Sequence, residues 1–262
     1  MKQFAAIVVI LVIGLTLQAS PPPKVATEVV EYRHGDVVLE GFLAYPFVAT
    51  TKRPGILVVH EWGGLGSYAK KRAEKLAQLG YVAFAIDMYG KGVHPESVED
   101  KIKQVTIYKF DRKLMRARAE AGLDVLRSSK LVDPHRIAAI GYCFGGTVAL
   151  ELARSGADLA GVVSFHGGLD TPDLNDAKNI KGKILVLHGA DDPNVPPEQV
   201  SAFEEEMRKA KVDWQLIKYG GAVHAFTNPD AGSDPSKGAA YNHNADLRSW
   251  EAMEAFFGEI FR

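Results

Sequence analysis

The feature that most limits how this chain can fold is a short segment in which one cysteine stands among glycines. Residues 141–146 read Gly-Tyr-Cys-Phe-Gly-Gly, and Cys143 is the single cysteine of the 262 residues. An apolar, strand-like run precedes this segment at 136–140, and a helix-forming run follows at 147–153. A strand that turns at once into a helix strains the turn residue, and the flanking glycines remove side chains that would collide. The pattern predicts a nucleophile elbow, with a buried core cysteine as the competing interpretation.

Two further candidates follow Cys143 in the chain order acid, then histidine, which is the order of α/β-hydrolases. Asp192 lies just after the buried strand predicted at 183–188, where a carboxylate can orient an imidazole. His224 lies on a loop after the last predicted strand, 214–219, and before the closing helix. The order predicts a triad of Cys143, Asp192 and His224, although a surface position for the histidine stays open.

The alternation of strand and helix signals predicts an α/β-hydrolase fold, a mostly parallel twisted sheet with helices on both faces. Residues 26–33 and 37–44 indicate an antiparallel pair, and the region 98–129 indicates a long helical crossover with room for a break in its middle. The many charges of 112–127 favour a mostly solvated helix face. The other expected strands are 54–60, 81–86, 136–140, 159–165, 183–188 and 214–219, and the other expected helices are 67–79, 147–153, 197–209 and 245–261.

A glutamate sharpens the comparison with known families. Glu61 follows the strand that ends at His60, where hydrolases of this fold place the loop with the second oxyanion-hole N–H. Together with the cysteine elbow, Asp192 and His224-Ala225-Phe226, this glutamate resembles the dienelactone hydrolase family. The resemblance extends from about residue 29 to the C-terminus.

The resemblance implies specific roles for these residues. Cys143 would be the nucleophile, with Asp192 and His224 completing the triad. Glu61 would hydrogen-bond the resting thiol and move away when substrate binds. The backbone N–H groups of Phe144 and Trp62 would form the oxyanion hole. The alternative for Glu61 is a helix-capping or solvated carboxylate.

The substrate contacts depart from the best-known members, which hold a carboxylate with two arginines. Lys91 stands near one of these places, and no cation follows His224 in residues 225–228. Lys91 lacks the bidentate fork of arginine, so dienelactone itself is in doubt as the substrate. Tyr89 and His166 follow predicted strands and are expected, with core packing as the alternative, to line the pocket.

The N-terminus predicts export. A short cationic start and an uncharged, mostly apolar stretch at 4–17 precede Ala19, which suits signal cleavage. Residues 1–19 are therefore a predicted signal peptide, and 20–262 a single hydrolase domain. The mature protein would be periplasmic or extracellular without stable membrane association; an uncleaved anchor is the alternative.

The net charge and the motifs of the sequence limit which partners and cofactors are expected. The formal net charge is −1, and removal of residues 1–19, which hold one lysine, gives −2. A nearly neutral surface disfavours nucleic acid as a partner. His60-Glu61 resembles the start of a zinc motif, but position 64 is glycine, so no metal or other cofactor is expected.

The sequence thus predicts a cysteine hydrolase that cleaves a small ester or lactone through an acyl-enzyme, without a cofactor. The alternative is a hydrolase-fold protein that senses thiols or binds a ligand without turnover. The intact set Cys143, Asp192 and His224 favours the enzyme.

Overall fold

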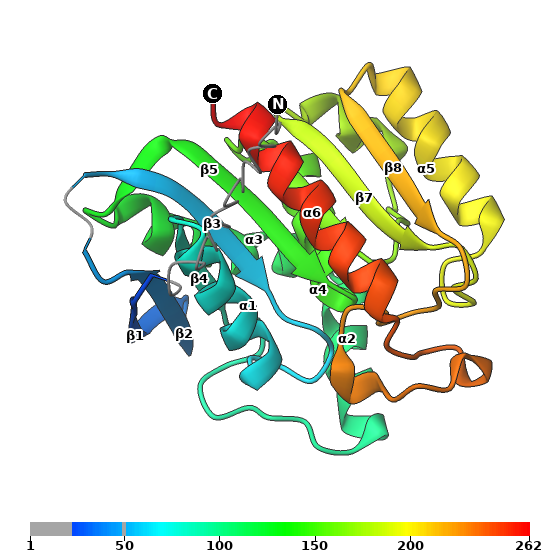
Figure 1. Cartoon of the computed structure of the whole chain (residues 1–262), viewed down its shortest axis with the longest axis horizontal. Coiled ribbons are helices and arrows are strands. Elements are labelled where there is room, and N and C mark those ends of the chain that lie inside the picture. Colours follow the sequence, from blue (N-terminus) through cyan, green and yellow to red (C-terminus); the bar gives the residue numbers. More distant parts are fainter. Residues whose placement is uncertain (1–22, 49–50) are drawn as a thin grey trace, which may run out of the picture.

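The computed structural model describes residues 23–48 and 51–262, which form one eight-stranded sheet in the order β1-β2-β4-β3-β5-β6-β7-β8 (Figure 1). β1 pairs antiparallel with β2, and β2 pairs antiparallel with β4, whereas all pairs from β4 to β8 are parallel. The expected mostly parallel sheet is confirmed. The strands are β1 Val25–His34, β2 Val37–Pro46, β3 Arg53–Val59, β4 Val82–Ile86, β5 Val132–Tyr142, β6 Gly161–Phe165, β7 Lys183–Gly189 and β8 Trp214–Tyr219.

Helices cover both faces of the sheet, because the central strands are apolar on both sides. Every residue of β4 and of β6 is buried. One face packs against α1 (Ser67–Gln78) and α6 (His243–Ile260), and the other against α3 (Arg112–Ser128), α4 (Phe144–Arg154) and α5 (Pro197–Ala210). α2 (Val98–Phe110) lies against α3, and three short 3₁₀ helices, η1 Leu174–Asn179, η2 Pro229–Ala231 and η3 Pro235–Lys237, lie in loops.

The long helical region breaks at Asp111, because this residue caps the second helix. Its side chain accepts a hydrogen bond from the Leu114 N–H at 2.8 Å, as N-cap residues do. The expectation of a mostly solvated charged face on α3 is wrong. Met115 and Leu123 join the core. Arg116 is held by carboxylates of other elements, so several of these charges are used inside the protein.

The sheet brings the predicted residues to one edge. Glu61 follows β3, Cys143 follows β5, and His166 follows β6. Asp192 and His224 come after β7 and β8, respectively. Because these strands are parallel, their carboxyl ends lie side by side, which is where ligands bind in open α/β sheets.

The predicted signal segment, residues 1–19, lies outside the described residues. Among the helices of residues 23–48 and 51–262, none combines the length and the apolar character that crossing a membrane requires.

Candidate active site

Cys143 occupies a strained turn between β5 and α4. Its φ of 54° is in the left-handed region, which is uncommon for a residue with a side chain. The surrounding glycines make room for this turn. A Cβ at Gly141 would lie 1.9 Å from the Gly145 carbonyl oxygen, and a Cβ at Gly145 would lie 2.3 Å from the Val59 carbonyl oxygen. The backbone therefore fixes the direction of the thiol.

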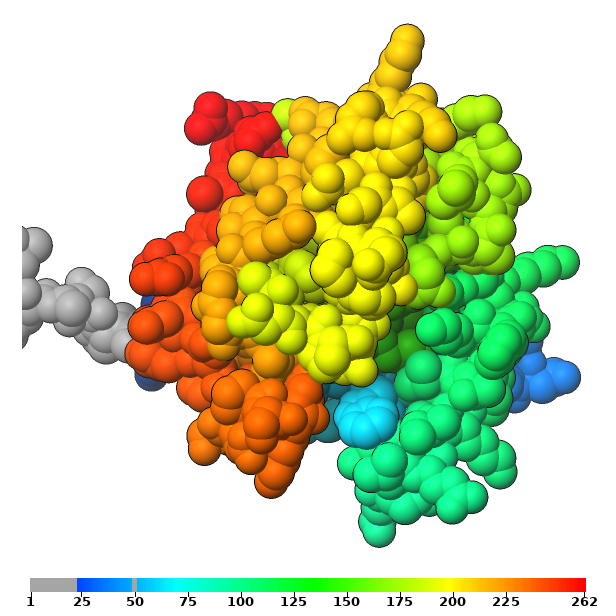
Figure 2. Space-filling view, turned by 90° about the vertical axis from the view of Figure 1, so that its right-hand side faces the viewer, coloured from blue at the N-terminus to red at the C-terminus, as the bar shows by residue number. Residues whose placement is uncertain are grey.

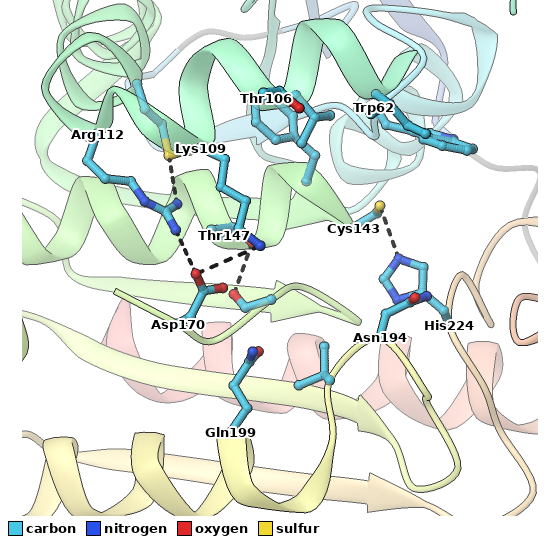
Figure 3. Close-up of a pocket in the computed structure, with 16 residues that line it drawn as sticks. Trp62, Thr106, Lys109, Arg112, Cys143, Thr147, Asp170, Asn194, Gln199 and His224 are labelled. Carbon is cyan, nitrogen blue, oxygen red and sulfur yellow. Dashed lines mark hydrogen bonds and ion pairs between the residues drawn. The ribbon is translucent and has the colours of Figure 1, made fainter. Parts of the chain in front are cut away.

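The thiol meets an imidazole that is itself held by a carboxylate. The Cys143 Sγ lies 3.1 Å from the His224 Nε2, as the dashed line in Figure 3 marks. The His224 Nδ1 lies 2.8 Å from an Asp192 carboxylate oxygen, Oδ2. The second Asp192 oxygen accepts a hydrogen bond from the Asn194 N–H at 2.8 Å. The three side chains form the linear order thiol, imidazole and carboxylate.

The surroundings of His224 favour its protonated form. Burial by itself would lower the pKa of His224, but the facing Cys143 sulfur and the Asp192 carboxylate together raise this pKa well above its ordinary value. Asp192 is buried, so its attraction to the imidazole is weakly screened by water. The imidazole can therefore take and hold the proton of the thiol.

Two backbone N–H groups beside the thiol can hold an oxyanion. Phe144 begins α4 and Trp62 lies in the turn after β3. Within the described residues neither N–H donates to a protein acceptor. The peptide that carries the Trp62 N–H is oriented because its carbonyl, that of Glu61, accepts hydrogen bonds from the Gly64 N–H and the His60 ring. Both expected oxyanion-hole residues therefore follow strands that end at the same edge of the sheet, next to Cys143.

Glu61 contacts a different partner from the one expected. One of its carboxylate oxygens, Oε2, accepts a hydrogen bond from the Asn228 side-chain amide at 2.6 Å, whereas the thiol faces His224. The expected hydrogen bond between Cys143 and Glu61 is therefore wrong for this structure. The other oxygen, Oε1, is buried and has no partner among the described residues. Burial raises the pKa of Glu61 above its ordinary value, although Asn228 and His224 oppose this shift.

Two cavities meet at the thiol. The first, about 260 Å³, extends toward α2 and α3, and the second, about 710 Å³, extends toward α1 and the loop after His224. In Figure 2 the cyan segment after β3 is exposed between the green α2 region and the orange loop after β8. Trp62, Cys143, Asn194 and His224 line both cavities. A small substrate can therefore extend to either side of the thiol.

The first cavity changes character along its length. Ile102, Val105 and Val195 give its sides an apolar surface. Its far end is charged, as Figure 3 shows: Arg112 donates to Asp170 at 2.9 Å, and the Lys109 ammonium lies 4.0 Å from the same carboxylate. A group bound there would find donors and acceptors away from the reacting atoms.

Two residues expected to contact substrate lie elsewhere. Lys91 pairs with Glu31 at 2.6 Å on the surface, and neither cavity is lined by it. Tyr89 is buried behind the oxyanion loop, where its hydroxyl donates to the Trp62 carbonyl at 2.9 Å. Both expectations as substrate contacts are wrong. Lys91 is drawn to Glu31 and Glu40 of the first hairpin, and the Tyr89 hydroxyl supports the loop through its bond to the Trp62 carbonyl.

His166 also does not line either cavity, contrary to expectation. The residue is 1% exposed and has a left-handed φ of 40°. Its Nδ1 lies 3.1 Å from the Cys143 backbone nitrogen, and its Nε2 lies 2.7 Å from the Thr227 hydroxyl oxygen. Its ring therefore lies between the Cys143 main chain and the loop after His224.

The sequence reasoning missed several residues of the cavities. Asn194 follows Asp192 in a loop, and Asn228 follows His224 by four positions, so nearness to the triad was an available signal. The contribution of α2 was missed as well. Ile102, Val105, Thr106 and Lys109 repeat at helical spacing, which indicates one helix face but not what that face covers.

No metal site can be assigned to the described part of the chain. Residues 23–48 and 51–262 contain no group of three or more His, Cys, Asp or Glu side chains placed to hold a metal ion. The site's reactive groups are the thiol, the imidazole and the carboxylates.

The fold and the site define the class of protein. A mostly parallel sheet that carries a strained cysteine elbow, then an acid, then a histidine at the ends of successive strands is an α/β-hydrolase.

Comparison with known proteins gives the family. The sequence pattern of the dienelactone hydrolase family matches residues 39–261. A putative carboxymethylenebutenolidase of Aquifex aeolicus is 28% identical over 236 residues, covering 88% of this chain and 97% of that protein. A probable 2-oxo-3-(5-oxofuran-2-ylidene)propanoate lactonase of Bradyrhizobium sp. is 28% identical over 215 residues, covering 77% and 86%. The crystal structure of a dienelactone hydrolase-like promiscuous phosphotriesterase, P91, from metagenomic libraries superposes with a TM-score of 0.86 at 42% identity, covering 90% of this chain and 98% of that one.

The chain belongs to the dienelactone hydrolase family, and it is a hydrolase that acts on ester bonds.

Proposed function

We propose that this protein hydrolyses a small carboxylic ester or lactone by covalent catalysis at Cys143, with His224 as base and Asp192 as its orienting acid. The observation that carries the proposal is the continuous contact from thiol to imidazole to carboxylate, 3.1 Å and 2.8 Å long. A thiol is a weak nucleophile until an adjacent base or a lowered pKa activates it, and this contact supplies the base.

The first half of the reaction forms an acyl-enzyme. The His224 Nε2 takes the thiol proton, and the sulfur attacks the carbonyl carbon. The carbonyl electron pair moves to oxygen, which the N–H groups of Phe144 and Trp62 stabilise. The carbon–oxygen ester bond then breaks, and the leaving oxygen takes the proton from His224. The product is a thioester on Cys143.

The second half regenerates the thiol. His224 takes a proton from water, and the resulting hydroxide attacks the thioester carbon. The carbon–sulfur bond breaks, the acid leaves, and the thiolate of Cys143 recovers its proton from His224. For a lactone the alcohol remains attached to the acyl group, so the single product is a hydroxy acid.

Glu61 takes an electrostatic role in this proposal. The thiol already faces His224, so release of the thiol from Glu61 is not needed to start the reaction. A carboxylate held by Asn228 near His224 would favour the imidazolium that forms when the thiol loses its proton. We therefore assign Glu61 to stabilisation of positive charge on His224.

The test combines turnover with trapping on purified protein. Short p-nitrophenyl esters and a panel of lactones should be hydrolysed. A slow ester should add the mass of its acyl group to the protein, as seen by intact mass spectrometry. A phosphotriester belongs in the panel because a structural relative is named for that activity. Stoichiometric alkylation of Cys143 without turnover of any panel member would instead favour a thiol-sensing or ligand-binding protein.

We also propose that the protein is exported and begins near residue 20 in its mature form. The cationic start and apolar stretch of residues 1–17 support this proposal. Mass spectrometry of native protein should find the mature N-terminus in the exported fraction. An intact Met1 or Lys2 on cytoplasmic protein would overturn the proposal.

A further inference from the structure

His166 connects the two segments that supply the reacting side chains, although it touches neither cavity. Its Nδ1 lies 3.1 Å from the backbone nitrogen of Cys143, whose N–H is shared with the Phe165 carbonyl at 3.0 Å. Because that nitrogen donates, Nδ1 of His166 must carry no proton. The ring proton is therefore on Nε2, which donates to the Thr227 hydroxyl oxygen at 2.7 Å.

Thr227 is a fixed anchor for the other side of the connection. It lies three positions after His224 and is fully buried. Its carbonyl accepts a hydrogen bond from Arg72 at 2.6 Å, and its hydroxyl contacts the Tyr68 hydroxyl at 2.6 Å. Arg72 in turn pairs with Asp246 of α6 at 2.6 Å. Thr227 is therefore tied to both helices of one face of the sheet.

The geometry points to His166 as a positioning residue: its neutral ring joins the main chain of Cys143 to the loop of His224 and so sets the distance between Sγ and Nε2. This inference rests on the proposed function, because it concerns the same thiol and imidazole. The contact of 3.1 Å between sulfur and nitrogen spans two loops that follow different strands. A misplacement of about 1 Å in such a contact can cost ~10²-fold in rate.

Burial and nearby positive charges keep the His166 ring neutral. Burial, followed by the nearby His224 and Arg72, holds the pKa of His166 well below its ordinary value. The His166 and His224 ring centres are 5.4 Å apart in an edge-to-face arrangement. His188 also faces it with a weaker effect in the same direction. A proton on Nδ1 would remove the bond to the Cys143 N–H and place a second positive charge beside the His224 imidazolium.

Three variants separate the two bonds of His166. His166→Phe keeps a ring and removes both bonds, whereas Thr227→Val removes only the hydroxyl. His166→Asn keeps an acceptor at the δ position and tolerates the left-handed backbone, but it does not reach Thr227. Tyr219→Phe is the matched control: it removes a buried hydroxyl that has no partner among the described residues and so joins no two loops.

The measurements are kcat, KM and the pH dependence of iodoacetamide alkylation of Cys143. We expect His166→Phe to lower kcat by about 10²-fold with little change in KM and to shift the alkylation profile. Thr227→Val and His166→Asn should each lower kcat by about tenfold. The double variant His166→Phe, Thr227→Val should be no slower than His166→Phe alone, because both changes remove the same connection.

The inference is overturned if the two single effects multiply in the double variant. It is also overturned if kcat and the alkylation profile stay at wild-type values while only the melting temperature falls. If His166→Phe does not fold, Thr227→Val and His166→Asn carry the same test. Failure of the proposed function is a different result, because the wild-type protein would then show no turnover, or Cys143→Ala would retain it, whatever the His166 variants do.

Discussion

The two ends of α4 are built in opposite ways. At its start, Cys143 stands at the N-cap with no side-chain capping bond, and the Phe144 N–H has no protein acceptor in the described chain. At its end, Arg154 is completely buried and donates to Glu151, to both oxygens of Glu206 and to the Leu169 carbonyl. One end leaves donors open for a ligand, whereas at the other end every guanidinium nitrogen of Arg154 donates to a protein acceptor.

The difference shows how one short helix serves two purposes. Unfilled donors and strained backbone cost stability, and they persist only where the surrounding structure holds them in place. The buried ion cluster at the far end fixes α4 against α5 and the loop after β6, because Arg154 donates to Glu206 and to the Leu169 carbonyl. Changes at the start of α4 should therefore affect the reaction, and changes at the end should affect folding.

The largest effect is expected for Cys143→Ala. The change removes the sulfur that attacks the substrate, so kcat should fall by more than about 10⁴-fold, while the melting temperature stays within a few degrees of wild type. Steady-state kinetics and a thermal melt on the same sample check both parts. A variant with a hundredth of the wild-type kcat would break the assignment of catalysis to this end of α4.

Asp192→Asn should have the next largest effect. The amide cannot stabilise the imidazolium and favours the wrong imidazole tautomer, so kcat should fall by about 10³-fold or more. Loss of this carboxylate should also lower the pKa of His224, since Asp192 helps to raise it. The acidic limb of the rate profile, which reports protonation of the base in the free enzyme, should therefore move to lower pH. An unchanged kcat would contradict the orienting role.

Arg154→Met tests the other end of the helix. The change leaves the Glu206 carboxylate buried without its cation, and burial already raises the pKa of Glu206. The loss in free energy of unfolding should be about 3–5 kcal/mol, measured by chemical denaturation, with kcat of the folded fraction nearly unchanged. Arg208→Met is the control, because its pair with Glu205 is exposed and screened by solvent and should contribute little to stability. A large fall in kcat without a loss of stability would contradict the assignment of this end of α4 to folding.

Glu61→Gln should have the smallest effect, and it should act in opposite directions on activity and stability. Loss of the negative charge near His224 should lower kcat/KM by about tenfold, or ~1.4 kcal/mol.

Stability should rise slightly, and the sign follows from the raised pKa of Glu61. As pH rises past the ordinary value of 4.5, the unfolded chain releases this proton while the folded chain keeps it, so the free energy of unfolding falls across that interval. Glutamine does not titrate, so the variant should lack this decrease in the free energy of unfolding. Chemical denaturation of both proteins at pH 4 and pH 7 measures the decrease. If the wild type and the variant lose equal stability between these pH values, the raised pKa of Glu61 is not its cause.

The backbone-determined part of the site could be predicted from the sequence. The glycines around Cys143 indicate a turn too tight for side chains, which is what the structure has. The order of residues along the chain predicted that Asp192 and His224 follow the strands from which they contact each other and Cys143. Asp192 contacts His224, as predicted, whereas its neighbour Asp191 accepts a hydrogen bond from the Gly221 N–H.

The side-chain partners could not be predicted, because they depend on tertiary packing. Glu61 has Asn228 as its partner across 167 positions, and nothing local to either residue signals this pair. The resemblance to family members with a substrate-binding arginine places Lys91 near substrate, yet Glu31 of the first hairpin holds it on the surface. His166 was correctly placed at a strand end, but the direction of its ring was wrong.

The position of α2 affects how readily the substrate preference of such an enzyme can change by mutation. The helix lines the first cavity with Ile102, Val105, Thr106 and Lys109, yet within its own span only Tyr108 is buried. Substitutions at the lining positions therefore alter the shape offered to a substrate without opening a void in the hydrophobic core. A mutant library confined to this helix could search for new substrates while the elbow, whose glycines tolerate no side chain, remains untouched.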